Sequence, residues 1–301
     1  MVAPTASAAP VRPVSALAVR EWPLATWLPV CAAAVAFVLL FASPVSTLFH
    51  DWMHDDDANY GLLLFPVAVW LAWRTGLRTD MAPDRRGGTI ILVAATLIRL
   101  LGSIAAEFFS QRFAIWLAIV GLIVFCFGWR QVRSWWLPLI VLLLAIPLPA
   151  LFINQLAIPL QFRASRLGTA MIHWRHIPVR TQGNVIQIPE ALLFVAEACS
   201  GLRSLSALVA LGVLLGGMYL GTVVSRIVLV ALVVPVAVLL NGVRIFLTAF
   251  LIHFVDPSLG TGLAHEREGM LMFAAAFAIL GGCTAVVRLV ERKVAPGALH
   301  G

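Results

Sequence analysis

The sequence predicts an all-α polytopic membrane protein with about eight transmembrane helices, a small extracytoplasmic cap and both termini in the cytoplasm. Of its 301 residues, 61% are hydrophobic and only 12% are charged, a composition outside the range of soluble globular domains. The apolar residues gather in long runs, close to the ~20 residues that a helix needs to cross a bilayer. Membrane barrels show short alternating strands instead, so the runs predict helices.

Each part of the chain has its own signature. Residues 1–22 are rich in Ala, Pro and Ser and predict a disordered cytoplasmic tail. The transmembrane domain is expected over residues 23–293, followed by a cytoplasmic tail at 294–301. The first apolar run is too long for the core of a signal peptide, so we expect it to remain as a span. The predicted spans are residues 24–43, 60–73, 89–106, 113–129, 135–152, 199–220, 227–252 and 265–288.

The arginines and lysines between the runs predict the orientation, because these residues favour cytoplasmic segments. With the N-terminus inside, nearly all of them fall on the cytoplasmic side, whereas the acidic stretch "HDWMHDDDANY" (50–60) falls outside. One segment departs from this rule. Residues 153–198 carry Arg163, Arg166, Arg175 and Arg180 on the predicted outer side.

The external segment 153–198 is predicted to form the cap. "INQLAIPLQFRASRLGTAMIHWRH" (153–176) alternates apolar and basic positions at helical spacing, which predicts a helix in the outer interface. The following "IPVRTQGNVIQIPEALLFVAEA" predicts two short strands around a turn at residues 182–184. This cap precedes the sixth span directly.

Three chemically distinct side chains are predicted to share one depth. Cys199 lies ~33 Å from the inner end of its helix, Arg244 ~27 Å from the inner anchor of the next, and His265 ~35 Å from the inner end of the last. A bilayer core is ~30 Å thick, so a thiol, a guanidinium and an imidazole reach the outer boundary. The spacing predicts shared depth; it does not predict contact.

Cys199 has neighbours that favour a reactive thiol. The N-terminus of a helix stabilises the thiolate, and Arg203 follows at i+4. Glu197 is expected to orient a neighbour or to cap the helix, because a carboxylate acting beside the thiol would raise its pKa. The alternative for Cys199 is a small packing residue, as we expect for Cys31, Cys126 and Cys283.

Arg244 and His265 each allow two interpretations. An arginine within a membrane helix is costly and indicates function, and Asn241 one turn earlier offers it a hydrogen-bond partner. Alternatively, Arg244 extends to the outer headgroups and His265 is an ordinary interfacial histidine.

The remaining polar residues are assigned plainer roles. The four cysteines lack the spacing of metal ligands, and the net charge of +7 comes without a basic stripe, so neither a metal site nor nucleic-acid binding is expected. Arg99 is expected to pair with Glu107 or with lipid. A solvated acidic loop is favoured over a metal site for His50, His54 and Asp55–Asp57, and an amphipathic surface for His173 and His176.

Three motifs in this order carry a resemblance: "VAEACSGLRSL" (195–205), "NGVRI" (241–245) and "HEREG" (265–269). Together they resemble the exosortase/archaeosortase family of membrane transpeptidases, closely over roughly the second half of the chain. The resemblance implies that Cys199, Arg244 and His265 form the catalytic set. The sequence departs from the family pattern at Tyr60, a position where family members commonly have a histidine.

The resemblance also implies partners and a location. The expected substrates are secreted proteins with a tripartite C-terminal sorting tail: a short motif such as Pro-Glu-Pro, an apolar helix and a basic cluster. The acyl acceptor is left open between an amine or lipid, which gives transpeptidation, and water, which gives cleavage. The enzyme is expected in the bacterial cytoplasmic membrane, among membrane lipids, with its active site facing outward and without a metal or organic cofactor.

Two other classes of function compete with a cysteine peptidase as interpretations of this sequence. A transporter or channel for a lipid-linked or small solute would use intramembrane arginines too, but it favours polar residues at the midplane and related halves. A serine-type intramembrane protease needs a Ser–His pair, and the chain contains no Gly-x-Ser-x-Gly pattern.

Overall fold

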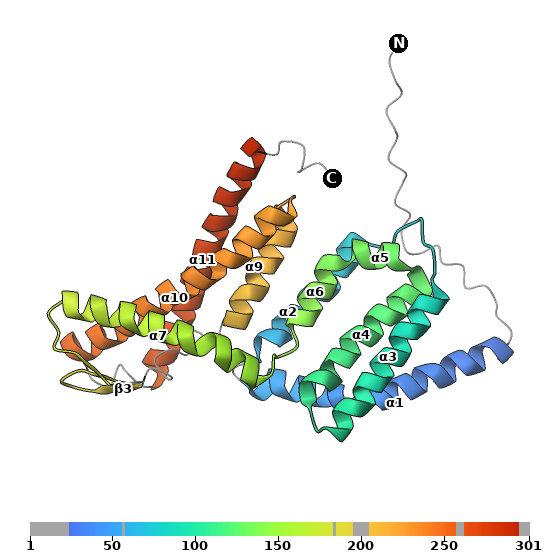
Figure 1. The fold of residues 1–301 in the computed structure, drawn as a ribbon, viewed down its shortest axis with the longest axis horizontal. Coiled ribbons are helices and arrows are strands. Elements are labelled where there is room, and N and C mark those ends of the chain that lie inside the picture. Colours follow the sequence, from blue (N-terminus) through green and yellow to red (C-terminus); the bar gives the residue numbers. More distant parts are fainter. Residues whose placement is uncertain (1–23, 56–57, 183–184, 195–204, 257–261, 295–301) are drawn as a thin grey trace, which may run out of the picture. The chain divides into compact units, whose positions relative to one another are not determined.

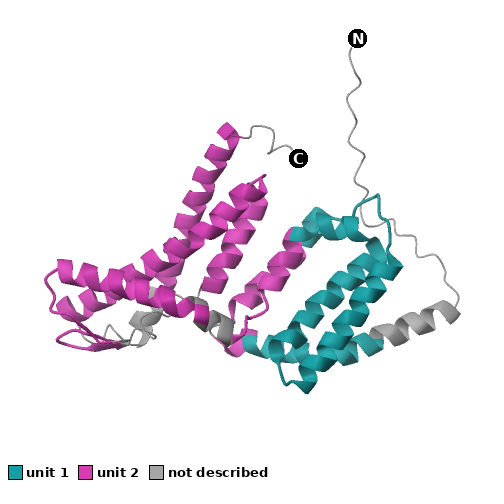
Figure 2. Cartoon of the chain, in the orientation of Figure 1, with its two compact units in different colours: residues 1–51, 72–136 teal, residues 52–71, 137–301 magenta. Residues whose placement is uncertain are grey.

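The computed structural model describes residues 24–55, 58–182, 185–194, 205–256 and 262–294, and it divides the chain into two compact units (Figure 2). Unit 1 comprises residues 1–51 and 72–136, and unit 2 comprises residues 52–71 and 137–301. The described residues are mostly helical, and long apolar helices occur in both units. The chain is therefore a polytopic helical membrane protein.

The elements follow one another as the sequence predicts, with a helical N-terminal part, a small sheet and three further helices (Figure 1). They are α1 (Leu24–His54), α2 (Tyr60–Thr75), α3 (Arg85–Ile104), α4 (Phe108–Phe127), α5 (Trp129–Ser134), α6 (Trp136–Leu144), α7 (Ala150–Trp174), β1 (Arg180–Gln182), β2 (Val185–Gln187), β3 (Leu192–Phe194), α9 (Leu205–Tyr219), α10 (Val223–Phe254) and α11 (Gly262–Val294).

Five stretches within the described helices are long and apolar enough to cross a membrane: Val35–His54, Arg85–Ile104, Phe108–Phe127, Val223–Phe254 and Gly269–Val294. Two further predicted spans coincide with shorter apolar helices, α2 and α9, the latter described only from Leu205.

The one remaining predicted span, residues 135–152, differs from expectation. It is divided between α6, which ends at Leu144, and α7, which begins at Ala150. Pro147 and Pro149 lie in the break. Proline lacks the backbone N–H that a helix needs and disfavours helical geometry in the residue before it, so the apolar run does not continue as one helix.

Unit 1 is built on an antiparallel pair, α3 and α4. Gly88 permits their close approach, because a Cβ at this position would lie 2.5 Å from the Cα of Phe125. Phe41 of α1 joins the core between them, where Ala95 and Ala114 are fully buried. The small side chains at this contact explain why two helices joined by only three residues pack so closely.

In unit 1, Arg99 and Glu107 do not pair with each other as predicted, and each has other hydrogen-bond partners. Arg99 Nε donates to the Leu40 carbonyl at 3.2 Å. Glu107 instead caps α4, where its carboxylate accepts from the backbone N–H groups of Phe109 and Ser110. Burial alone would raise the pKa of Glu107, but these hydrogen bonds outweigh it and hold the pKa below its ordinary value.

Unit 2 is organised around α10, which contacts α7, α9 and α11. The α7–α10 crossing is close because a glycine faces it: a Cβ on Gly168 would lie 2.8 Å from Ile245 and 2.9 Å from the Gly242 carbonyl. Toward the N-terminal end of α10, Leu208 and Leu280 join Val233 in a second cluster that ties α9 and α11 to it.

The sheet of unit 2 is antiparallel in the order β1-β2-β3. The predicted hairpin is confirmed, since Gln182 pairs with Val185 across residues 183–184, which lie outside the described residues. The third strand was not predicted; a tight turn at Pro189–Glu190 leads into it, closed by reciprocal backbone hydrogen bonds between Ile188 and Ala191.

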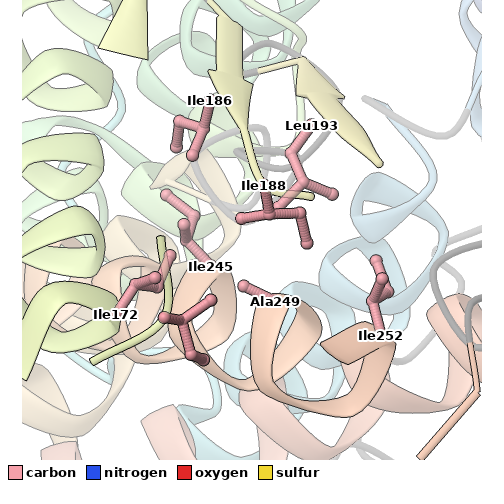
Figure 3. Close-up of a cluster of buried hydrophobic side chains, with 8 residues drawn as sticks. Ile172, Ile186, Ile188, Leu193, Ile245, Ala249 and Ile252 are labelled. Carbon is pink, nitrogen blue, oxygen red and sulfur yellow. The ribbon is translucent and has the colours of Figure 1, made fainter. Parts of the chain in front are cut away.

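The sheet packs on the C-terminal part of α10. Side chains from α7, the sheet and α10 form one buried apolar cluster, labelled in Figure 3 for all but Ile177: Ile172, Ile177, Ile186, Ile188, Leu193, Ile245, Ala249 and Ile252. Glu190 and His253 add a polar contact at 2.8 Å beside it. The cap predicted over 153–198 is therefore a helix and a sheet anchored to one end of α10.

The opposite end of α10 is held by a buried carboxylate. Glu291 of α11 accepts hydrogen bonds from the backbone N–H groups of Gly221 and Thr222 in the α9–α10 turn, at 3.2 and 2.6 Å. Arg226 donates to the Leu220 carbonyl at 2.8 Å. The C-terminal end of α11 and the start of α10 therefore lie at the same level.

Replacing Glu291 by alanine is expected to destabilise unit 2 by about 2 kcal/mol or more, because two backbone donors lose a charged acceptor. The measurement is the midpoint of thermal unfolding in detergent. Arg292→Ala, an exposed neighbour on the same helix, is the control and should change the midpoint little. Equal midpoints for the two variants would show that Glu291 does not hold the turn.

Candidate functional site

A buried polar stripe runs along α10 near its C-terminal end. Asn241, Arg244 and Thr248 recur at i, i+3 and i+7, and their side chains are only 3%, 5% and 3% exposed. Thr248 Oγ1 donates to the Arg244 carbonyl at 3.0 Å. An arginine this deeply buried in an apolar unit is costly and indicates a function.

Arg244 lies against the N-terminal part of α11. A Cβ built on Gly269 would lie 3.6 Å from Arg244 Nη2, so the guanidinium occupies the space beside this glycine. His265 lies one helical turn earlier in α11, on the same helix face as Gly269. The His265 side chain itself lies outside the described part of the structure.

The number of residues along α10 and α11 agrees with this contact. Arg244 is ~32 Å along α10 from Val223, and Gly269 is ~33 Å along α11 from Glu291. Glu291 bonds to the turn that begins α10, so both distances start from one level. Arg244 and the His265-bearing turn of α11 are thereby brought to one end of unit 2.

Cys199 is in the segment 195–204, outside the described residues, as are Glu197 and Arg203. The elements on either side of this segment are described. Leu193 of β3 shares a cluster with Ile245 of α10, and Leu205 at the start of α9 packs against the cluster that contains Ala237. The segment therefore connects β3 and α9, and each of these elements shares an apolar cluster with residues of α10.

The amide of Asn241 is buried, and neither its nitrogen nor its oxygen forms a hydrogen bond within the described residues, Arg244 included. The hydrogen bond that the sequence suggested between Asn241 and Arg244 is thus absent there. An i, i+3 spacing gives the two residues a common face, but the guanidinium extends toward Gly269. Buried amides usually have partners, and Asn241 lies in the same buried stripe as Arg244 and Thr248.

Sequence reasoning missed one residue of unit 2 and misjudged the start of the acidic stretch 50–60, which begins in unit 1. Thr248 extends the stripe, and its spacing of four from Arg244 was the available signal. Helix α1 continues to His54, so His50, expected in a loop, is helical. It lies 3.9 Å from Asp51, whose carboxylate also binds Arg112 of α4 at 2.7 Å.

The fold and the candidate site define a multi-pass helical membrane protein with a buried arginine near one end of a long span. Comparison with known families places it further: residues 52–282 match the family model for transmembrane exosortase, which is well over half of the chain. The chain therefore belongs to the exosortase family, as its motifs predicted. No curated protein and no solved structure matches it.

Family membership has consequences for class and location. It is consistent with processing of sorting signals in general, suggests a membrane peptidase or transpeptidase, and agrees with the apolar helices in indicating a multi-pass membrane protein. The matched range begins at Trp52, whose indole donates to the Ala145 carbonyl at 2.9 Å, and it ends within α11. It thus includes α10 with Arg244 and the part of α11 that contains Gly269.

Proposed function

We propose that this chain is a membrane-embedded cysteine peptidase or transpeptidase that cleaves C-terminal sorting tails from secreted proteins at the outer face of the bacterial cytoplasmic membrane. The observation that carries the proposal is Arg244: 5% exposed, at one end of a spanning helix and against α11 one turn from His265. Cys199 is supplied by the segment that joins β3 to α9, and both of these elements share apolar clusters with α10, the helix that carries this arginine.

The proposed reaction has two covalent steps. The Cys199 thiolate attacks the scissile carbonyl carbon, and the negative charge that develops on the carbonyl oxygen is stabilised by the Arg244 guanidinium. His265 gives a proton to the departing amine nitrogen as the carbon–nitrogen bond breaks, leaving a thioester on Cys199. His265 then takes a proton from the acceptor, which attacks the thioester and restores the thiolate.

The guanidinium suits this role because of its surroundings. It is buried among apolar helices, where a charge interacts more strongly than in water. Gly269 leaves room beside Nη2 that a larger residue would fill. Arg203, Asn241 and Glu197 are proposed to balance charge and orient the three reacting groups. Neither a metal nor an organic cofactor enters these steps.

The membrane arrangement is proposed from the charge pattern. Eight spans with both termini inside place the α9–α10 turn and Glu291 at the cytoplasmic face and the sheet at the outer face. A tripartite sorting tail matches this arrangement: its basic cluster stays inside, its apolar helix lies beside the enzyme, and its motif reaches the level of Arg244. The acceptor is an amine, a lipid or water.

Co-expression with a model substrate tests the proposal. A secreted reporter with a Pro-Glu-Pro-type motif, an apolar helix and a basic cluster is produced with and without this chain, and its intact mass is measured. A shortened reporter only in the presence of the chain is the expected result, and any added mass identifies the acceptor. A reporter of unchanged mass across a panel of tail motifs would contradict the proposal.

A further inference from the structure

A surface pocket lies where α7 passes into the sheet, outside the candidate catalytic stripe. Its volume is about 590 Å³, and the described residues that line it include His173, His176, Arg180 and Gln187, with Ile177 and Ile188 buried beneath. No acidic residue is among those lining residues. Arg180 brings a permanent positive charge, and each imidazole offers an N–H donor in either charge state. The pocket is therefore suited to an anion.

His176 occupies a backbone position where glycine is usual. Its φ is +59°, and it ends α7 in a Schellman arrangement: His176 N–H donates to the His173 carbonyl at 2.9 Å and Ile177 N–H to the Ile172 carbonyl at 3.4 Å. A side chain at this left-handed position carries a conformational cost that glycine avoids. The imidazole kept there lines the pocket, which indicates that the side chain itself is used.

The pocket lies at the level of a membrane boundary. The sheet beside it packs on α10 from Ile245 to Ile252, and Ile245 is ~33 Å from the start of α10, about the thickness of a bilayer core. Trp174, between the two histidines in sequence, is 75% exposed. Exposed tryptophans favour the headgroup region of a membrane.

We infer that this pocket binds the phosphate group of an anionic membrane lipid. A phosphate accepts hydrogen bonds from a guanidinium and from imidazole N–H groups in one cluster. This assignment also accounts for Arg180, one of the four arginines of residues 153–198 that depart from the usual preference for the cytoplasmic side, because a lipid phosphate neutralises its charge. A carboxylate on a peptide would satisfy the same donors, but it leaves the exposed Trp174 beside the pocket unexplained.

Short-chain lipids test the inference on the full chain in an uncharged detergent. Dioctanoyl phosphatidylglycerol should raise the midpoint of thermal unfolding, and dioctanoyl phosphatidylcholine should not. Arg180→Gln should raise the apparent Kd for phosphatidylglycerol by about tenfold or more, because one charge-assisted hydrogen bond is lost. Arg163→Gln, an exposed arginine on the same segment, is the matched control and should retain the affinity.

His176→Gly separates a lipid contact from a structural role. Relief of the positive φ should raise the midpoint without lipid, while the response to phosphatidylglycerol weakens; a purely structural histidine would not give this combination. Full response in both Arg180→Gln and His176→Gly would overturn the inference. So would an equal response to inorganic phosphate, or a response only to an acidic peptide, because either would assign the pocket to a ligand other than lipid.

Discussion

Cys199→Ala is expected to abolish processing of a tailed reporter while the protein still inserts and folds. Alanine keeps the small, apolar character of the position but removes the only atom that can form the thioester, so the expected loss is roughly a thousandfold or more. The measurement is the intact mass of the reporter after co-expression, with the amount of membrane-inserted enzyme quantified in the same cells.

The matched controls are two other cysteines of the chain. Cys126 is exposed on α4 and Cys283 is partly buried on α11, and both are free thiols. Alanine at either position should leave processing within about twofold of the original, because these thiols are expected only to pack. Retained processing by Cys199→Ala, or its loss in a control variant at equal enzyme level, would rule out Cys199 as the nucleophile.

Arg244→Lys is expected to lower processing by about a hundredfold or more, the range seen when an oxyanion donor is removed. Lysine keeps the positive charge, but it replaces a planar fork of five N–H donors with a single ammonium on a flexible stem. The Arg244 guanidinium is buried and lies against Gly269 of α11, which fixes the direction of its N–H groups. A single ammonium group does not reproduce that geometry. Initial rates of reporter cleavage in membranes give the measurement.

Arg99→Lys is the matched control for Arg244→Lys, since Arg99 is another arginine within a spanning helix; it is partly buried and donates to the Leu40 carbonyl. It should process the reporter normally. The thermal unfolding midpoint of Arg244→Lys should stay close to that of the original, because the charge is kept. Normal processing by Arg244→Lys would reduce Arg244 to a membrane anchor.

The fold was largely predictable because hydrophobic runs report helices directly. The runs at 89–106 and 227–252 correspond to α3 and α10. The break before α7 was missed because apolarity outweighed Pro147 and Pro149, although proline interrupts helices however apolar its neighbours are. Strand β3 was missed since three residues after Pro189–Glu190 carry too little periodicity to separate them from the helix expected to follow.

The level of Arg244 relative to α11 was predictable from the sequence, but the contacts of Arg244 were not. Counting residues along two helices placed Arg244 and the start of α11 at one level, and the approach of Gly269 to Arg244 agrees with that count. Partners could not be predicted in this way, because a spacing of three or four residues gives a shared face and leaves the rotamers open. The hydrogen bond expected between Asn241 and Arg244 is absent from the described residues for this reason. Arg99 donates instead to the Leu40 carbonyl of α1, a partner far away in the sequence that no local spacing indicates. His173 and His176 line one pocket where α7 ends in the hydrogen-bonded turn between Ile172 and Ile177. The helical pattern of the sequence does not indicate this turn.

The central claim is that Cys199 carries the substrate as a thioester, and hydroxylamine tests this claim most directly. When the tailed reporter is processed in membranes with excess hydroxylamine, a thioester is intercepted and the product ends in a hydroxamate, which intact mass distinguishes from a carboxylate. We predict a hydroxamate product whose share rises with hydroxylamine concentration. A product that ends only in a carboxylate, or in the natural acceptor, at every concentration while cleavage continues would contradict the thioester.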